Sequence, residues 1–227
     1  SGSNFLISGK FTPPYSLFDN LDDEDYAGLS DQDLFLWTEL YKIKFKAEWY
    51  QPLTKDKKLV LSPRIGFAFM GAYNQAKGVS PFERFYLGGS GLTGFQMDGR
   101  EIIALRGYDD LAVSPNVGAP IIAKYTMELR YPVSLNPSAT VYGLVFAEAG
   151  NTWTNFKEFD PFQVKRSLGA GVRIFLPMFG LLGVDYGWGF DQLEPYQQGA
   201  AGNNELIQSQ GYRGQFHFTI GMNLGEL

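Results

Sequence analysis

The stretch WTELYKIKFKAEWY, residues 37–50, alternates between two kinds of side chain. From Tyr41 to Trp49, every second residue is aromatic or aliphatic. Charged residues fill the positions between them, namely Lys42, Lys44, Lys46 and Glu48. Successive side chains of a β-strand point to opposite faces, so this period of two predicts a strand. Because four charges along one face cannot lie in a dry core, the strand must have one wet face and one apolar face.

Seven further segments share this alternation. They cover residues 4–11, 58–73, 121–133, 139–150, 164–177, 181–190 and 212–224. The chain has 227 residues, of which 27 are glycine and 16% are aromatic, a composition that favours strands and tight turns over helices. The sequence therefore predicts an all-β, antiparallel fold of eight strands in a single domain spanning residues 1–227.

The composition excludes several classes of function. With no cysteine, the chain has no disulfides, thiolate zinc sites or cysteine nucleophiles. His217 is the one histidine, and no Gly-x-Ser-x-Gly motif accompanies it, so we expect no enzyme and place His217 among the polar inward residues. The 19 basic residues against 24 acidic ones argue against a nucleic-acid partner. The acidic residues 19–26 lack the spacing of a calcium loop, so neither a metal nor a cofactor is predicted.

Signals for membrane insertion by helices are also missing from the sequence. No run of 18 apolar residues predicts a transmembrane helix. Residues 1–10 lack the basic and apolar regions of a signal peptide. We therefore expect either that the mature protein begins here or that the chain is part of a longer protein.

Two all-β folds fit an alternating chain: a soluble barrel with charges outside, and an outer-membrane barrel with charges inside. Three features favour the membrane barrel. Its apolar faces begin and end in aromatic residues, and its strands are long enough to cross a membrane at a tilt. Short connections at 52–56, 134–137 and 178–180 alternate with long ones at 14–36, 74–119, 154–163 and 191–210. We expect a transmembrane β-barrel surrounded by outer-membrane lipids, with 74–119 as a long extracellular loop.

Within that loop, FYLGGSGLTGF at 85–95 is followed by LRGYDD at 105–110. This pair of stretches resembles the sixth extracellular loop of the BamA family, outer-membrane proteins that insert other β-barrels into the bacterial outer membrane. The hallmark of that loop is Val-Arg-Gly-Phe/Tyr. Its four positions are occupied here by Leu105, Arg106, Gly107 and Tyr108. An alignment without a gap would place Thr93 at the arginine position, but threonine offers no fork of donors.

Three other stretches are similar to motifs of the same family. A Phe-x-Asp-x-Gly motif matches Phe146, Glu148 and Gly150, and a Gly-x-Gly-x-Arg motif matches Gly169, Gly171 and Arg173. The closing GQFHFTIG resembles the last strand of the family and contains Gly214, Phe216, Phe218 and Gly221. Glu148 replaces the aspartate of the family motif, which keeps a carboxylate acceptor but lengthens it by one methylene.

The resemblance implies a contact inside the barrel. In the family this loop folds back into the lumen, where its arginine meets groups on the inner wall. A bidentate pair between Arg106 and Glu148 would lock the loop, with Gly169 and Gly171 leaving space beside Arg173 for its tip. Read from spacing alone, Arg106 could equally be a solvated loop charge.

The resemblance also implies a function without covalent chemistry. Family members have sixteen strands preceded by POTRA domains, and the eight strands here resemble the C-terminal half of such a barrel, with POTRA domains absent. The implied role is the central barrel of the β-barrel assembly machinery in the bacterial cell outer membrane. Implied partners are nascent outer-membrane β-barrel proteins and, in the full-length parent, accessory assembly lipoproteins. A two-partner-secretion type barrel that translocates protein and a passive outer-membrane pore are the alternatives.

The predicted lock depends on whether the eight strands close on themselves. In that case residues 1–13 would pair with residues 211–224, and the interior would be just wide enough for side chains. We would then expect the loop to be displaced outward and the contact between Arg106 and Glu148 to be broken. In a sixteen-stranded parent the contact should be intact.

Overall fold

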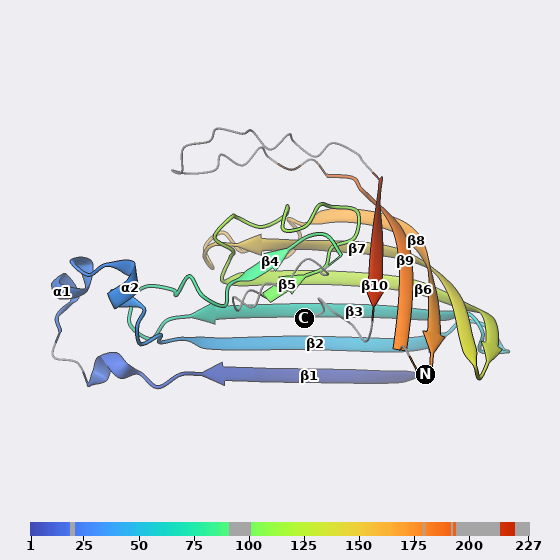
Figure 1. Cartoon of the computed structure of the whole chain (residues 1–227), viewed down its shortest axis with the longest axis horizontal. Helices are drawn as coiled ribbons and strands as arrows, with labels where there is room; N and C mark the ends of the chain where they lie inside the picture. Colours follow the sequence, from blue (N-terminus) through green and yellow to red (C-terminus); the bar gives the residue numbers. More distant parts are fainter. Residues whose placement is uncertain (19–20, 91–100, 179, 192, 194–213, 221–227) are drawn as a thin grey trace.

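One curved antiparallel sheet of eight strands forms the body of the molecule in the computed structural model (Figure 1). The structure describes residues 1–18, 21–90, 101–178, 180–191, 193 and 214–220. The order of strands in the sheet is β1 (Gly2–Phe11), β2 (Tyr41–Pro52), β3 (Val60–Gly71), β6 (Ile121–Asn136), β7 (Ala139–Trp153), β8 (Lys165–Leu176), β9 (Gly180–Gly189) and β10 (Gly214–Ile220). Each of the eight predicted segments overlaps one of these strands, so the predicted antiparallel all-β fold is confirmed.

The second strand begins at Tyr41, four residues later than the alternation from Trp37 predicted. Glu39 explains the difference, because its carboxylate is used outside the sheet. It accepts hydrogen bonds from the Ser16 hydroxyl at 2.7 Å and from the Lys77 ammonium at 2.8 Å. These contacts tie the segment before β2 to the start of the same connection and to the connection that follows β3.

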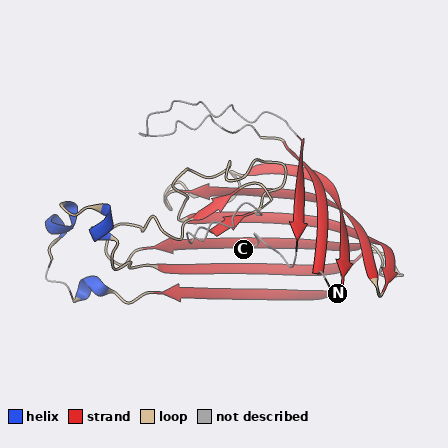
Figure 2. Ribbon diagram, in the orientation of Figure 1, coloured by secondary structure: helices blue, strands red, loops and turns tan. Residues whose placement is uncertain are grey.

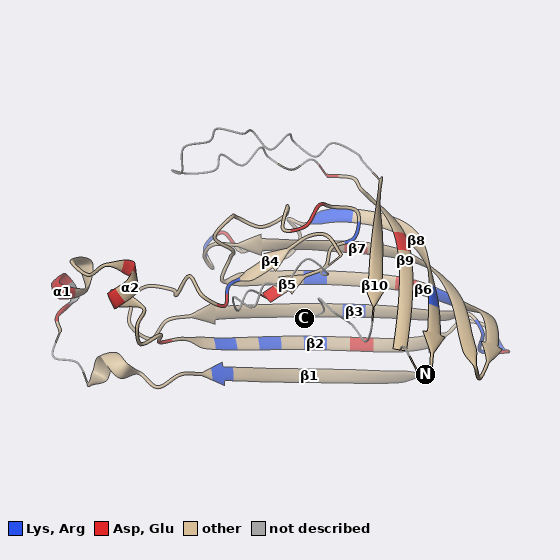
Figure 3. Cartoon of the chain, in the orientation of Figure 1, with Lys and Arg blue, Asp and Glu red and all other residues tan. Residues whose placement is uncertain are grey.

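Charged and apolar side chains separate onto opposite faces of the sheet, as the alternation predicted. On β6, the side chain of Glu128 is 3% exposed and that of Val133 is 72% exposed. On β10, the corresponding values are 3% for His217 and 55% for Phe218. Figure 3 shows both signs of charge along β2. The charged side chains therefore lie on the concave face, and the soluble barrel with its charges outside is wrong.

The sheet is open. In the described part of the chain β1 pairs with β2 alone and β10 with β9 alone, so these two strands form its edges. Twist accumulates across the ladders, and β9 and β10 run steeply across the view in which β1 to β3 lie nearly horizontal (Figure 1). The eight-stranded form closed on itself is therefore wrong for this structure, and the displacement of the loop, which was expected for that closed form alone, stays a prediction.

The connection 74–119 has a structure that its sequence did not predict. Its strands β4 (Phe85–Leu87) and β5 (Glu101–Ile103) pair in parallel. It shares a buried apolar cluster with the concave face of the sheet. The members are Leu40, Ala68, Met70, Phe85, Leu87, Ile103, Leu105, Tyr108, Val113 and Ile122. This packing fixes the position of the residues that follow β5.

Three short helices lie in the connection between β1 and β2, beyond the ends of the strands (Figure 2). They are η1 (Tyr15–Leu17), α1 (Asp23–Ala27) and α2 (Asp31–Leu34). Acidic residues without basic ones occur on α1 and α2 (Figure 3). Among the residues that the structure describes, no helix has the length and apolar character needed to cross a membrane.

Candidate functional site

Residues 105–108, called the loop tip below, follow β5 and lie against the concave face of the sheet. Gly107 has a φ of +95°, a backbone conformation that favours glycine. A Cβ added to Gly107 would also lie 2.8 Å from the backbone nitrogen of Gly189 on β9. The loop tip thus requires glycine at this position both for its turn and for its close approach to the wall.

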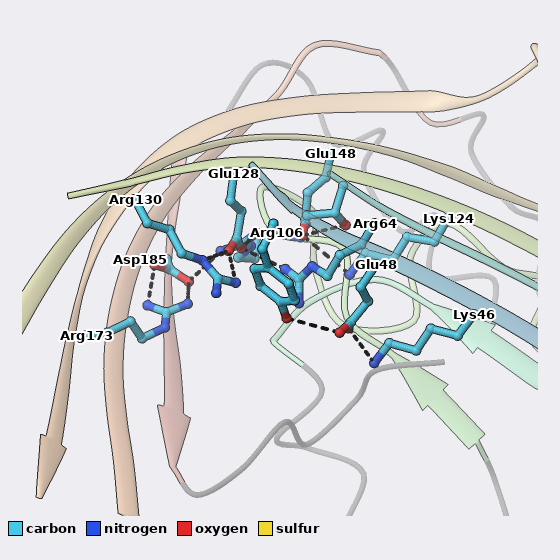
Figure 4. Close-up of polar contacts among 12 residues, drawn as sticks. Lys46, Glu48, Arg64, Arg106, Lys124, Glu128, Arg130, Glu148, Arg173 and Asp185 are labelled. Atoms are coloured by element: carbon cyan, nitrogen blue, oxygen red, sulfur yellow. Dashed lines mark hydrogen bonds and ion pairs between the residues drawn. The ribbon is translucent and has the colours of Figure 1, made fainter. Parts of the chain in front are cut away.

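Arg106 carries the main polar contacts of the loop tip (Figure 4). One terminal nitrogen of its guanidinium donates to Glu148 and to Glu128, each at 2.7 Å, and the other donates to Asp185 at 3.1 Å. Its backbone N–H donates to the second oxygen of Glu148 at 2.9 Å. Three carboxylates from β6, β7 and β9 therefore converge on one buried guanidinium.

Further cations from the wall surround these carboxylates (Figure 4). Glu128 accepts from Arg64 at 2.8 Å and from Arg130 at 2.6 Å. Arg173 holds Asp185 by two hydrogen bonds of 2.6 Å, a fork geometry that only arginine provides. Each buried carboxylate in this cluster therefore has at least two cationic neighbours, counting Lys124 at 3.4 Å from Glu148. Such pairing offsets the cost of removing the charges from water.

Phe146 lies beneath the guanidinium of Arg106, whose central carbon is 3.6 Å from the ring centre. This distance is that of a cation–π contact, favourable where water is excluded. The two motif residues Phe146 and Glu148 thus contact the same arginine from one face of β7. Gly150, the third residue of that motif, lies two residues further along β7, where an added Cβ would be 3.2 Å from the side chain of Leu87 on β4.

The glycines of β8 serve a different purpose from the one expected. A Cβ on Gly169 would overlap the ring of Phe146, and a Cβ on Gly171 would overlap the carboxylate of Asp185. The space that these glycines leave is therefore filled by wall side chains that touch Arg106, and not by the loop tip itself. Arg173, the last residue of the motif, fixes Asp185 in that space.

The seat of the loop tip is on β9. A Cβ added to Gly187 would lie 2.7 Å from the backbone nitrogen of Gly107. One added to Gly189 would lie 2.8 Å both from the Gly107 carbonyl oxygen and from the ring of Tyr108. The alternating glycines of GVDYGWG, opposite the aromatic face of that strand, were the signal for this close approach.

Tyr108 and Gly107 extend the contacts to the two remaining strands. The hydroxyl of Tyr108 donates to the backbone carbonyl of Arg166 on β8 at 2.8 Å, and burial raises the pKa of this phenol. The backbone N–H of Gly107 donates to Nε2 of His217 on β10 at 2.8 Å. The loop tip consequently makes hydrogen bonds to every strand from β6 to β10.

Residues 27–223 match the model of the Omp85 superfamily domain. The chain belongs to the Omp85 superfamily. Outer membrane protein assembly factor BamA of Neisseria meningitidis serogroup B is 29% identical over 117 residues, which are 51% of this chain and 14% of that protein. The chain thus spans about a seventh of this curated relative.

A solved structure shares the fold. The crystal structure of BamA from Haemophilus ducreyi lacking POTRA domains 1–3 superposes with a TM-score of 0.60 at 18% identity. The match covers 95% of this chain and 37% of the other. The predicted BamA-type barrel region and the predicted location in the bacterial outer membrane are confirmed by these comparisons.

Three polar residues of this Omp85 site were not singled out from the sequence. The alternation of residues places Glu128 and Asp185 on the inner face, where Glu48 or Glu128 was expected to pair with the lysines at 42, 44 and 46, and His217 was placed there without a role. Glu128 instead pairs with Arg64, Arg106 and Arg130. All three residues occupy positions of the alternation that face the lumen. This was the signal for them, because an arginine that enters the lumen meets carboxylates that point inward. The alternation shows which face of the sheet a side chain lies on, but not how far along the barrel axis it lies. That position decides which of these side chains reach Arg106.

The closing strand of this Omp85 chain contributes little to the loop tip through its motif residues. Phe216 packs against Tyr186 of β9 with ring centres 5.0 Å apart, and Phe216 and Phe218 both point outward. A Cβ on Gly214 would overlap the hydroxyl of Tyr186, so this glycine makes room for that ring. Gly221 lies outside the described residues.

A cavity of about 290 Å³ lies beside Arg106. Charged residues from several strands line it, including Glu48, Arg64, Arg130 and Arg173. Both signs of charge face this space, so its character is that of a wet lumen. Within the described ranges no three histidine, cysteine or acidic side chains are placed to hold a metal ion.

Proposed function

We propose that the chain is the C-terminal half of the barrel of an outer-membrane protein assembly factor, and that it acts by pairing strands and not by covalent chemistry. The matched family is not a family of enzymes, and the curated relative is named for outer-membrane protein assembly. One structural observation carries the proposal. A buried arginine fastens residues 105–108 to β6, β7 and β9, and Tyr108 and Gly107 add β8 and β10, the last of which is an unpaired edge of the described sheet.

The mechanism begins at the edge of β10. An edge strand presents N–H and C=O groups on which an incoming strand can form a ladder. In the described structure β10 pairs on one side with β9, and its other side is open. A nascent outer-membrane β-barrel protein would add its strand there. Accessory assembly lipoproteins would act on the full-length parent.

The loop tip would keep this edge in a fixed geometry. The contacts of Arg106 with β6, β7 and β9 hold the inner face of the sheet, so the strands next to the edge cannot shift independently. A passive pore has no need for such a brace. Apolar side chains on the outer face, such as Val133 and Phe218, would contact outer-membrane lipids.

The test is replacement of the parent protein in its host by variants of the full-length chain. We expect Arg106→Ala to lower the amount of folded outer-membrane proteins, scored by heat-modifiable migration on gels. Lys157→Ala is the control, since that side chain is exposed in the connection between β7 and β8, away from the cluster. Normal assembly by Arg106→Ala, at an unchanged level of the variant, would overturn the proposal.

A further inference from the structure

The edge strand β10 has support from only one neighbour in the described sheet. Its seven residues pair with β9. A strand held by one ladder is the least stable part of a sheet, because half of its backbone groups lack a partner strand. Any contact on its inner face therefore has a large influence on whether it stays in place.

Two inward side chains of β10 meet the loop. Nε2 of His217 accepts the backbone N–H of Gly107 at 2.8 Å, and both groups are buried. Two residues earlier on the same face, the side-chain amide of Gln215 donates to the carboxylate of Asp109. These contacts place the start of β10 directly on the loop tip and the residue that follows it.

The histidine contact fixes the form of the ring. Nε2 can accept a hydrogen bond only if it carries no proton, so the imidazole is neutral with its proton on Nδ1. The donor is a backbone amide in a buried position, which would be left unsatisfied without this acceptor. The contact therefore depends on a hydrogen-bond acceptor at position 217 of β10, and not on the size of the ring.

We infer that His217, assisted by Gln215, is a positioning residue that latches the edge strand β10 to the loop tip. Arg106 anchors the tip to β6, β7 and β9, and Gly107 passes that anchorage to β10 one residue later. Release of the tip then loosens β10, and loss of the latch loosens β10 while Arg106 stays in place. The latch is a property of the fold, and its use in assembly rests on the proposed function.

The test is hydrogen exchange of the β10 amides, residues 214–220, in the full-length protein in lipid nanodiscs. We expect His217→Leu to speed exchange of β10 by about tenfold, the effect of one buried amide losing its acceptor, while β6 and β7 stay unchanged. His217→Gln, whose amide oxygen can accept the same hydrogen bond, should restore slow exchange. Gln215→Ala should have a smaller effect, since its partner is more exposed.

Thr219→Val is the matched control, an inward residue of the same strand whose side chain points into the cavity beside Arg106. It should leave the exchange of β10 unchanged. The inference is overturned if His217→Leu exchanges like the parent, if His217→Gln fails to restore protection, or if Thr219→Val loosens β10 equally.

A second measurement, by nuclear magnetic resonance, determines which nitrogen of the His217 imidazole carries the proton. The imidazole nitrogen-15 signal that disappears in His217→Gln should show the neutral tautomer with the proton on Nδ1. A proton on Nε2 would overturn the latch. Neither measurement depends on assembly, so normal assembly by Arg106→Ala would remove the proposed function and leave the latch standing.

Discussion

The two edge strands of the sheet differ in what holds them. All ten residues of β1 are exposed, and its inner face carries the solvent-exposed pair between Lys10 and Glu83. On β10, His217 is buried against the loop tip. In the connection 74–119, Glu101 pairs with Lys42 of β2, and the loop tip contacts β6 to β10. The connection 74–119 therefore holds β10 by buried contacts, whereas it meets β1 through an exposed ion pair beside the ladder with β2.

This difference shows how one connection can hold one edge of a sheet by buried contacts and the other edge by exposed contacts alone. On the side of β10, the buried Arg106 is held by three buried carboxylates, each from a different strand. On the other side, the ten exposed residues of β1 are where the other half of the proposed barrel would add its strand. Changes at the brace should consequently be costly, and equivalent changes near β1 should be mild.

The largest effect should follow from Arg106→Ala in the full-length protein. Removing this guanidinium strands Glu128, Glu148 and Asp185 in a buried site, so the free energy of unfolding should fall by about 3 to 5 kcal/mol. Denaturant titration in detergent micelles measures this loss. A loss below about 1 kcal/mol, the range of an exposed pair, would show that the cluster is well solvated.

A smaller loss should follow from Gly187→Ala, which places a methyl group 2.7 Å from the backbone of Gly107. Backbone cannot move aside as a side chain can, so the tip must shift, at a cost of about 1 to 3 kcal/mol. Gly143→Ala on β7 is the control, because an added Cβ there meets no atom of the described chain within 4 Å. Equal unfolding free energies for the two variants would contradict the seat on β9.

The alternation of side chains was sufficient to predict the strands, because a wet lumen and a lipid exterior impose a period of two on every one of them. The pair between Arg106 and Glu148 followed from the family resemblance. The roles of Glu128 and Asp185 depend on register, which places Thr126 beside Glu148 and Gly171 beside Asp185. No local pattern encodes these alignments between distant segments.

The glycines illustrate the same limit. A glycine in a strand indicates that something approaches closely, but it does not identify the neighbour. Gly171 was assigned to the loop tip and instead accommodates Asp185, whereas Gly187 received no role and seats the tip. The parallel pair β4 and β5 was missed because three-residue strands are too short to show a period.

Tyr108→Phe tests the brace at β8 by removing one hydroxyl. The lost hydrogen bond to the Arg166 carbonyl should lower the free energy of unfolding by about 0.5 to 1.5 kcal/mol, since the ring still packs. Denaturant titration measures it, with Tyr131→Phe on the exposed face of β6 as the control. If the two variants lose the same amount, the hydroxyl of Tyr108 is not part of the brace.

The smallest effect should come from Lys10→Met on β1, which keeps the aliphatic stem and removes the charge that pairs with Glu83. The lysine side chain is 56% exposed, so water screens the pair and the free energy of unfolding should change by less than about 1 kcal/mol. Hydrogen exchange of β1 should be as fast in the variant as in the parent. A slowing or a marked acceleration confined to β1 would mean that this edge is also held from the inside, and the contrast with β10 would fail.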